Sequence, residues 1–128
     1  MPSILVVEDE PALRRMLAFT LRDVGFDVRT AWNGVDALEQ VAGKTPDAIV
    51  LDLEMPVMDG RTFYHELRGR GLDTPVLILS AYGARKAQRE LGAEACVQKP
   101  FNADDLIDKL EQLVARAPGA AQHASRPD

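Results

Sequence analysis

Short apolar runs alternate along the chain with segments in which apolar residues recur at helical spacing. The apolar runs cover residues 4–7, 27–31, 48–51, 76–79 and 95–97. The first, third and fourth runs are continuously apolar, which is typical of strands buried on both faces of a parallel sheet. The second run mixes apolar and polar residues, which is typical of an edge strand. The pattern therefore predicts five strands, of which at least three lie in the interior of a sheet.

The gaps between these runs carry the helical stripes of apolar residues. In order, the stripes span residues 13–24, 35–41, 63–67, 84–91 and 106–114. The fourth stripe is the weakest, because it offers mainly Ala84, Ala87 and Leu91. Asn102 precedes the last stripe and is its predicted N-cap, since a side-chain oxygen there can accept from the first free N–H groups.

The order of elements is a strand followed by a helix, repeated five times. Right-handed crossovers between parallel strands place helices on both faces of one sheet. We therefore predict the α/β class, with a doubly wound five-stranded parallel sheet in one domain over residues 1–117. Residues 118–128 show no periodicity and contain only small apolar residues, so we expect a disordered tail or linker stump there.

Composition narrows the function classes. The chain has 128 residues, 46% hydrophobic and 27% charged, which is typical of one globular domain. No apolar run approaches the length of a membrane span, and a single Cys permits no internal disulfide, so a cytoplasmic location is expected. The net charge of −5 argues against direct nucleic-acid binding, which needs clustered Lys and Arg.

Polar side chains follow four of the predicted strands. Glu8 and Asp9 follow the first strand, Asp52 the third, Ser80 the fourth and Lys99 the fifth. Parallel strands bring their carboxyl ends to one edge, where ligands bind. A lone carboxylate in such a place is most often solvated or caps a helix. The combined positions of the five residues nevertheless favour one shared site.

The converging carboxylates point to a cation. Two like charges at 4 Å repel by about 1 kcal/mol in water and about 4 kcal/mol at an effective dielectric of 20. A hard divalent ion such as Mg²⁺ fits Glu8, Asp9 and Asp52, because the donors there are oxygen atoms. Lys99 would add a flexible positive charge suited to phosphate.

In combination, these residues and their flanking motifs resemble a known family, the receiver domain of two-component response regulators, in particular its single-domain, chemotaxis-regulator-like members. The resemblance covers about residues 3–116. It implies the flavodoxin-like (βα)5 fold with strand order 2-1-3-4-5. The motifs that carry it are Val6-Val7-Glu8-Asp9-Glu10, Asn33-Gly34, Ile49-Val50-Leu51-Asp52-Leu53-Glu54-Met55-Pro56, Met58-Asp59-Gly60, Ser80-Ala81 and Lys99-Pro100-Phe101.

The resemblance implies a role for each acidic residue. Asp52 is then the phosphoryl acceptor, whose carboxylate attacks phosphorus and forms an acyl phosphate. Glu8 and Asp9 hold Mg²⁺ together with the Asp52 carboxylate and the backbone carbonyl of Glu54. The chain would be a signalling switch that promotes its own phosphorylation and dephosphorylation, and not an enzyme with a separate substrate.

The resemblance also implies how the signal arises. Ser80 moves its hydroxyl to a phosphoryl oxygen, Lys99 pairs with the phosphate, and the Lys99-Pro100 peptide is cis. Phosphorylation then shifts an equilibrium between two loop arrangements. The implied donor is a sensor histidine kinase or a histidine phosphotransfer protein. With 128 residues used by the receiver and a stub, the expected output is a downstream protein target, or a portion absent from this sequence, with a homodimer as an option.

The sequence departs from the family pattern at two places on the expected output face. Family members carry Tyr, Phe or His three residues before the lysine, and this chain has Cys96, interpreted as a small buried hydrophobe that replaces the aromatic switch residue. The segment 80–99 is a few residues shorter than usual, which predicts a truncated or irregular fourth helix. We expect from both departures a non-standard partner face or dimer mode.

Two further side chains are expected to border the phosphoryl group. Glu54 lies two residues after Asp52, where an anion can repel phosphate or orient an attacking water. Tyr82 lies two residues after Ser80 and can shield the phosphate. The direction of their net effect on the phosphate lifetime stays open.

Three other functions stay open at this point. Asp52-Leu53-Glu54 loosely resembles the nucleophile motif of haloacid dehalogenase-type phosphatases and phosphotransferases, but a second Asp, a Thr and a cap insertion are missing. A flavodoxin-like cofactor binder needs a Gly-rich or hydroxyl-rich loop after the first strand, where this chain has Glu8-Asp9-Glu10. The third alternative is a receiver-like interaction module that is not phosphorylated.

Overall fold

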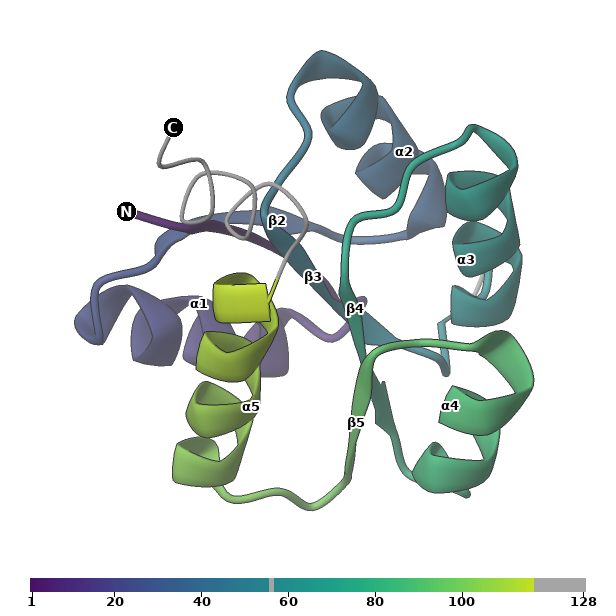
Figure 1. The fold of residues 1–128 in the computed structure, drawn as a ribbon. Coiled ribbons are helices and arrows are strands. Elements are labelled where there is room, and N and C mark those ends of the chain that lie inside the picture. Colours follow the sequence, from purple (N-terminus) through teal and green to yellow (C-terminus); the bar gives the residue numbers. More distant parts are fainter. Residues whose placement is uncertain (56, 117–128) are drawn as a thin grey trace.

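Five parallel strands form one central sheet. The computed structural model describes residues 1–55 and 57–116. Its strand order is β2-β1-β3-β4-β5, as predicted, with β2 at one edge (Figure 1). The strands are β1 (Ser3–Val7), β2 (Asp27–Ala31), β3 (Ala48–Asp52), β4 (Val76–Ser80) and β5 (Ala95–Gln98).

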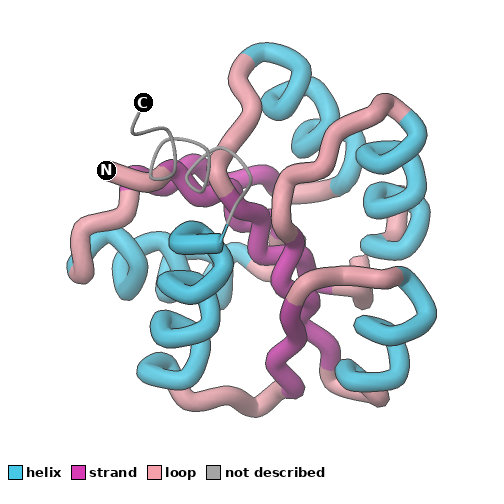
Figure 2. Tube along the Cα trace, viewed as in Figure 1, coloured by secondary structure: helices cyan, strands magenta, loops and turns pink. Residues whose placement is uncertain are grey.

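Helices cover both faces of the sheet. α1 and α5 lie on one face, and α2, α3 and α4 lie on the other (Figures 1 and 2). The helices are α1 (Pro11–Asp23), α2 (Gly34–Gly43), α3 (Gly60–Gly69), α4 (Ala84–Leu91) and α5 (Ala103–Arg116). The doubly wound prediction is therefore confirmed. None of the helices in residues 1–55 and 57–116 has the length and apolar character that a membrane crossing requires.

Each face of the sheet has its own apolar core. Successive side chains of a strand point to opposite faces, so Ile4 and Val6 pack with α1 and α5. Leu5 and Val7 pack instead with α2 and α3. All residues of β3 and β4 are buried. This double burial explains why the interior strands are continuously apolar in the sequence.

Polar caps start three of the helices soon after a strand ends. Asn33 Oδ1 and Asp59 Oδ1 each accept a hydrogen bond from the N–H three residues on, both at 2.8 Å. The bond from Thr62 N–H lowers the pKa of Asp59. Asn102 Oδ1 accepts from Asp104 N–H at 2.7 Å, which confirms the predicted cap of α5.

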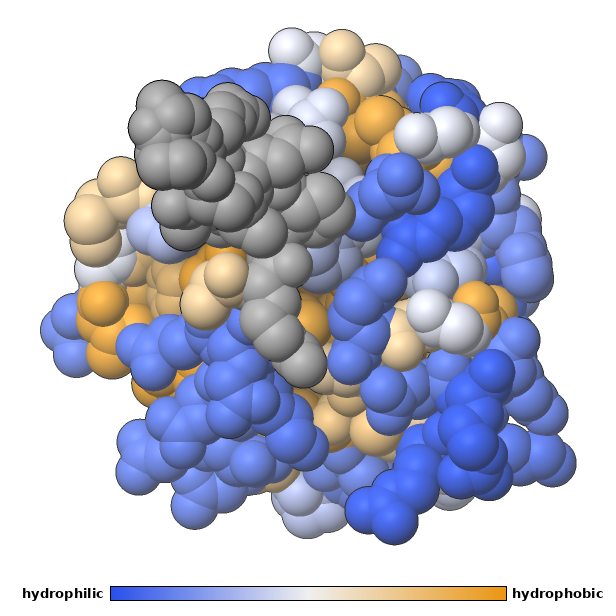
Figure 3. All heavy atoms as spheres, in the orientation of Figure 1, coloured by the Kyte–Doolittle hydropathy of each residue, from blue (hydrophilic) through white to orange (hydrophobic). Residues whose placement is uncertain are grey.

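The fourth helix is short but regular. α4 has eight residues, bounded by Gly83 and Gly92, whose φ angles of 59° and 79° lie in the left-handed region. Ala84 and Ala87 are its buried residues, and Leu91, the third member of the predicted stripe, is half-buried. The surface over α4 is mostly hydrophilic in Figure 3, whereas hydrophobic atoms are exposed over α1. α4 is the shortest of the five described helices, which agrees with the expectation of a truncated or irregular helix, and the non-standard partner face or dimer mode stays a prediction.

Three residues of the predicted helical stripes are exposed. Met16, in α1, is 43% exposed. Val24 follows the last residue of α1 and is 45% exposed. Val35 is 44% exposed because α2 instead turns Gly34, Ala37 and Leu38 toward the core. At Gly34 a Cβ atom would lie 2.7 Å from the sulfur of Met58, so a larger residue there would displace the Met58 side chain. The predicted tail, residues 118–128, lies outside the described residues, and the domain boundary at residue 117 stays a prediction.

Candidate functional site

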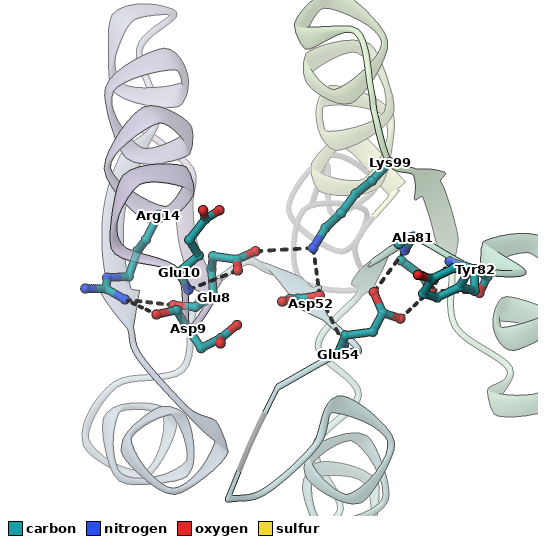
Figure 4. Close-up of polar contacts among 10 residues, drawn as sticks. Glu8, Asp9, Glu10, Arg14, Asp52, Glu54, Ala81, Tyr82 and Lys99 are labelled. Atoms are coloured by element: carbon teal, nitrogen blue, oxygen red, sulfur yellow. Dashed lines mark hydrogen bonds and ion pairs between the residues drawn. The ribbon is translucent and has the colours of Figure 1, made fainter.

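Two neighbouring strands bring three carboxylates together. β1 pairs with β3 in parallel register, with Val7 opposite Leu51. Glu8 and Asp9 directly follow β1, and Asp52 is the last residue of β3. One carboxylate oxygen from each of the three acidic residues lies within 4.8 Å of the other two. The convergence predicted from the strand ends is therefore found, and these side chains share one edge of the sheet (Figure 4).

Lys99 lies between the carboxylates. Its Nζ donates to Asp52 Oδ1 at 3.0 Å and lies 3.9 Å from Glu8 Oε1. The backbone holds this residue beside β4, because Lys99 N–H donates to Ser80 O at 2.8 Å. The Lys99-Pro100 peptide is cis, as expected. The structure thus places the predicted lysine in direct contact with the predicted acceptor.

The electrostatics of the cluster follow from its burial. Glu8 and Asp52 are each only 1% exposed. Burial, together with the charge of Asp52, raises the pKa of Glu8 to about 8. Burial also raises the pKa of Asp52, against the opposing hydrogen bond from Lys99. Burial acts to lower the pKa of Lys99, but the hydrogen bond to Asp52 and the nearby negative charges raise it overall.

The donor set fits a hard divalent cation. Glu8 Oε1 is a buried side-chain oxygen without a hydrogen-bond partner among residues 1–55 and 57–116. Asp9 is half-buried beside it. Three carboxylates with one ammonium leave excess negative charge, and the available ligand atoms are oxygens. The predicted additional ligand, the backbone carbonyl of Glu54, belongs to the loop after β3 and stays a prediction.

A guanidinium supports the acidic loop. Arg14 Nη1 donates to Glu8 O at 2.9 Å and to Asp9 O at 3.3 Å. Arg14 lies in the first turns of α1, so these bonds connect the loop to the helix that follows it. This contact was not predicted from the sequence. The signal that could have found it is a basic residue on the helix a few positions after two acidic residues.

The hydroxyl of Ser80 lies at the end of β4, on the opposite side of Asp52 from Glu8. Asp52 pairs with Leu79 across β3 and β4, and Ser80 is the next residue. Ser80 Oγ lies 2.6 Å from Glu54 Oε2 and 2.8 Å from Tyr82 O, so its single proton has two acceptors. Ala81 N–H donates to Glu54 Oε1 at 2.9 Å. In Figure 4 the Glu54 side chain points toward Ala81 and Tyr82.

Tyr82 and Cys96 do not join this site through their side chains. The Tyr82 residue is 81% exposed, and its backbone makes the contacts with Ser80. Cys96 is half-buried in β5 opposite Ile78, and it packs against the core beneath α2, α3 and α4. Its carbonyl accepts from Lys109 Nζ at 3.0 Å. This packing agrees with the interpretation of Cys96 as a small hydrophobe, but the residue is half-buried and not buried as expected.

Comparison with known proteins decides the family. The sequence model of the response regulator receiver domain matches residues 4–111. The chain belongs to the receiver domain family. Its curated relatives include the response regulator MprA of Mycobacterium tuberculosis, 40% identical over 116 residues, and MprA of Mycobacterium avium, 39% identical. These matches cover 88% of this chain, and the chain spans about half of the length of these relatives.

Solved receiver structures have the same fold. The receiver domain of Francisella response regulator 1452 has a TM-score of 0.85 and 31% identity, and the match covers 91% of this chain and 98% of that one. Chemotaxis protein CheY4 of Vibrio cholerae has a TM-score of 0.82 and 32% identity, with 88% and 98% coverage. NtrX of Brucella abortus has a TM-score of 0.86 and 28% identity, with 98% and 29% coverage. As a receiver domain, the chain is a component of two-component signalling.

Proposed function

We propose that this receiver is a phosphoacceptor switch in which Asp52 accepts a phosphoryl group. The observation that carries the proposal is the 3.0 Å hydrogen bond between Lys99 Nζ and Asp52 Oδ1, inside a cluster of three carboxylates. Oδ1 also accepts from Glu54 N–H at 3.1 Å. Two donors on one oxygen fix the orientation of the carboxylate, which is what a nucleophile needs before attack.

The chemistry requires little beyond position and charge. A carboxylate oxygen of Asp52 forms a bond to phosphorus while the bond from phosphorus to the leaving group of the donor breaks. The electron pair of that bond stays with the leaving group. Lys99 lies close enough to pair with the negative oxygens of the transferred group, and positioning supplies much of the remaining rate. The product is an acyl phosphate on Asp52.

Glu8, Asp9 and Asp52 are the residues that would hold Mg²⁺, with the Glu54 carbonyl as a further ligand. The unpartnered oxygen of Glu8 and the half-buried carboxylate of Asp9 support this assignment. When bound, Mg²⁺ supplies positive charge that offsets the oxygens of the phosphoryl group. Lys99 balances part of the same charge, and its four-carbon side chain lets the ammonium follow a phosphate.

The partners follow from family membership. We propose a sensor histidine kinase or a histidine phosphotransfer protein as the donor, and a downstream protein that reads the switch through α4, β5 and α5. The similarity to MprA and NtrX supports a second possibility for the output, a further domain of a longer regulator. We expect the protein to act in the cytoplasm, the usual location of this family.

Mass measurement of the intact protein tests this function. The protein is incubated with a small phosphoryl donor and Mg²⁺, and we expect a gain of one phosphoryl group. Asp52→Asn should gain none, because an amide does not replace the nucleophilic carboxylate. Asp73→Asn is the matched control on an exposed carboxylate and should behave as the wild type. No gain in the wild type would favour an interaction module that is not phosphorylated. An equal gain in Asp52→Asn would show that another residue accepts the phosphoryl group.

A further inference from the structure

The carboxylate of Glu54 accepts hydrogen bonds from two donors at the end of β4. Glu54 Oε2 accepts from the Ser80 hydroxyl at 2.6 Å, and Glu54 Oε1 accepts from Ala81 N–H at 2.9 Å. The first distance is in the range of hydrogen bonds between a hydroxyl and a charged oxygen. One carboxylate therefore bridges a side-chain donor and a backbone donor, although the Glu54 residue itself is exposed.

The same two donors form a small anion site. An O–H and an N–H of successive residues face one carboxylate, and each donates to a different oxygen of it. A phosphoryl oxygen carries similar charge and accepts hydrogen bonds with similar geometry. Ser80 is 1% exposed, so its hydroxyl reaches a new acceptor only where Glu54 now lies or at Tyr82 O.

The anion site lies next to the acceptor. Asp52 pairs with Leu79, the residue before Ser80, and Leu53 N–H donates to Leu79 O at 3.0 Å. Glu54 N–H in turn donates to Asp52 Oδ1 at 3.1 Å. A single residue, Glu54, thus contacts the acceptor through its backbone and the anion site through its side chain.

We propose that Glu54 is an internal competitor of the phosphoryl group. This proposal rests on the proposed function of Asp52 as the phosphoryl acceptor. A phosphoryl group on Asp52 takes the Ser80 hydroxyl and Ala81 N–H only after the Glu54 carboxylate releases both donors. The released carboxylate turns to solvent, which its exposure permits. Glu54 therefore opposes phosphorylation and restores the unphosphorylated arrangement once the phosphoryl group leaves.

The proposal differs from simple charge repulsion in one testable way. Glu54→Asp keeps the charge but removes one methylene, so the carboxylate no longer spans both donors. Competition predicts that Glu54→Asp is phosphorylated faster than the wild type, whereas repulsion predicts no change. Glu54→Gln removes the charge but keeps one acceptor oxygen, and Glu54→Ala removes both. Glu10→Gln is the control, because it removes a charge at the same edge of the sheet without touching Ser80 or Ala81.

The experiment measures the initial rate of phosphoryl gain by intact mass, with acetyl phosphate and Mg²⁺. We expect Glu54→Ala to react about tenfold faster than the wild type. A change of this size corresponds to about the free energy of one hydrogen bond to a charged group. Glu54→Asp and Glu54→Gln should lie between these two rates. Glu10→Gln should stay within about twofold of the wild type, since exposed charges are screened.

A second measurement follows the Ala81 amide by NMR in the unphosphorylated protein. Its resonance should shift and its hydrogen exchange should quicken in Glu54→Ala, but not in Glu10→Gln. An unchanged Ala81 amide, or a wild-type rate in either Glu54→Ala or Glu54→Asp, overturns the competition while leaving Asp52 as acceptor. No mass gain in any protein, the wild type included, overturns the proposed function and the competition together.

Discussion

The two sides of Asp52 differ in how their charges are compensated. On the acidic side (Glu8, Asp9 and Lys99), Glu8 shares the Lys99 ammonium with Asp52, and Glu8 Oε1 has no hydrogen-bond partner in the described part of the chain. On the hydroxyl side (Glu54, Ser80 and Ala81), one carboxylate holds two donors at 2.6 and 2.9 Å.

This difference separates two kinds of binding. The acidic side carries excess negative charge, so a cation can bind there without replacing a hydrogen bond of Glu8 Oε1. On the hydroxyl side, Glu54 already accepts the hydrogen bonds of Ser80 and Ala81, so an incoming anion has to replace the Glu54 carboxylate. Cation binding should therefore stabilise the protein by adding contacts. Phosphorylation should instead replace the hydrogen bonds of Glu54 with those of the phosphoryl group. Substitutions, pH and Mg²⁺ should therefore affect the two sides differently.

Removing the ammonium of the acidic side should have the largest effect on stability. Lys99→Met leaves buried Asp52 and Glu8 without a compensating charge, and we expect a loss of about 3 kcal/mol in the metal-free protein, because a buried pair broken at one partner is costly. Urea denaturation measures this loss. Lys109→Met is the matched control, since Lys109 forms a more exposed pair with Asp105. Equal losses in the two variants would show that Lys99 does not balance the cluster.

The acidic side should also make stability depend on pH. The pKa of Glu8 is about 8 in the folded protein and 4.5 in its ordinary state. The folded state therefore holds the proton more tightly, and this contribution is full below pH 4.5 and lost as the pH rises through 8. The raised pKa of Asp52 acts in the same direction. The metal-free protein should lose stability between pH 5 and about 8.5 through these groups.

Mg²⁺ should reverse that loss where the carboxylates are ionised. At a concentration a hundred times its dissociation constant it adds about 2.7 kcal/mol, and the gain should be larger at high pH than at low pH. Thermal unfolding of the wild type and Glu8→Gln, with and without Mg²⁺, measures both trends. Glu39→Gln, on an exposed residue of α2, is the control. A wild-type pH profile in Glu8→Gln would contradict the role given to Glu8.

The support of the acidic loop should matter less for stability than for ion affinity. Arg14→Ala removes the donors to Glu8 O and Asp9 O. We expect a loss of about 1 kcal/mol in stability and a Mg²⁺ affinity weaker by about tenfold, as for other residues that orient metal ligands. Mg²⁺ titration detected by the fluorescence of Trp32 or by calorimetry measures the affinity. Arg15→Ala, on the exposed neighbour, should change neither value.

The hydroxyl side should contribute least to stability. Glu54 is exposed, so its hydrogen bonds compete with water, and Glu54→Ala should change the free energy of unfolding by less than about 1 kcal/mol. The same denaturation series measures this value. A loss as large as that of Lys99→Met would mean that Glu54 is part of the structural core of the site, and the contrast between the two sides would fail.

Much of the fold was predictable because burial leaves its mark on the sequence. The apolar run at residues 48–51 predicts an interior strand, and β3 is buried throughout. The mixed run at residues 27–31 predicts an edge strand, and β2 lies at the edge. Asn102 predicts the start of α5 through its capping oxygen. Val35 was misplaced because a periodic stripe does not reveal that Gly34 takes the inner position against Met58.

The members of the site were predictable from strand ends, but their contacts were not. Topology alone brings Glu8, Asp52 and Lys99 to one edge. The direction of a side chain in a loop depends on its rotamer and on the donors nearby, which neither spacing nor composition reveals. The contacts of Glu54 with Ser80 and Ala81 are of this kind. Tyr82 shows the same limit, since its backbone and not its ring engages Ser80.

The location of the phosphoryl group tests the central claim most directly. Borohydride reduces an acyl phosphate of aspartate to homoserine, and tryptic cleavage after Lys44 and Arg61 gives a peptide that contains Asp47, Asp52 and Asp59. After reaction with acetyl phosphate and Mg²⁺, we predict homoserine at position 52 and unchanged aspartate at the other two positions. Homoserine at 47 or 59, or an unmodified peptide from protein that has gained a phosphoryl group, would contradict the assignment of Asp52 as the acceptor.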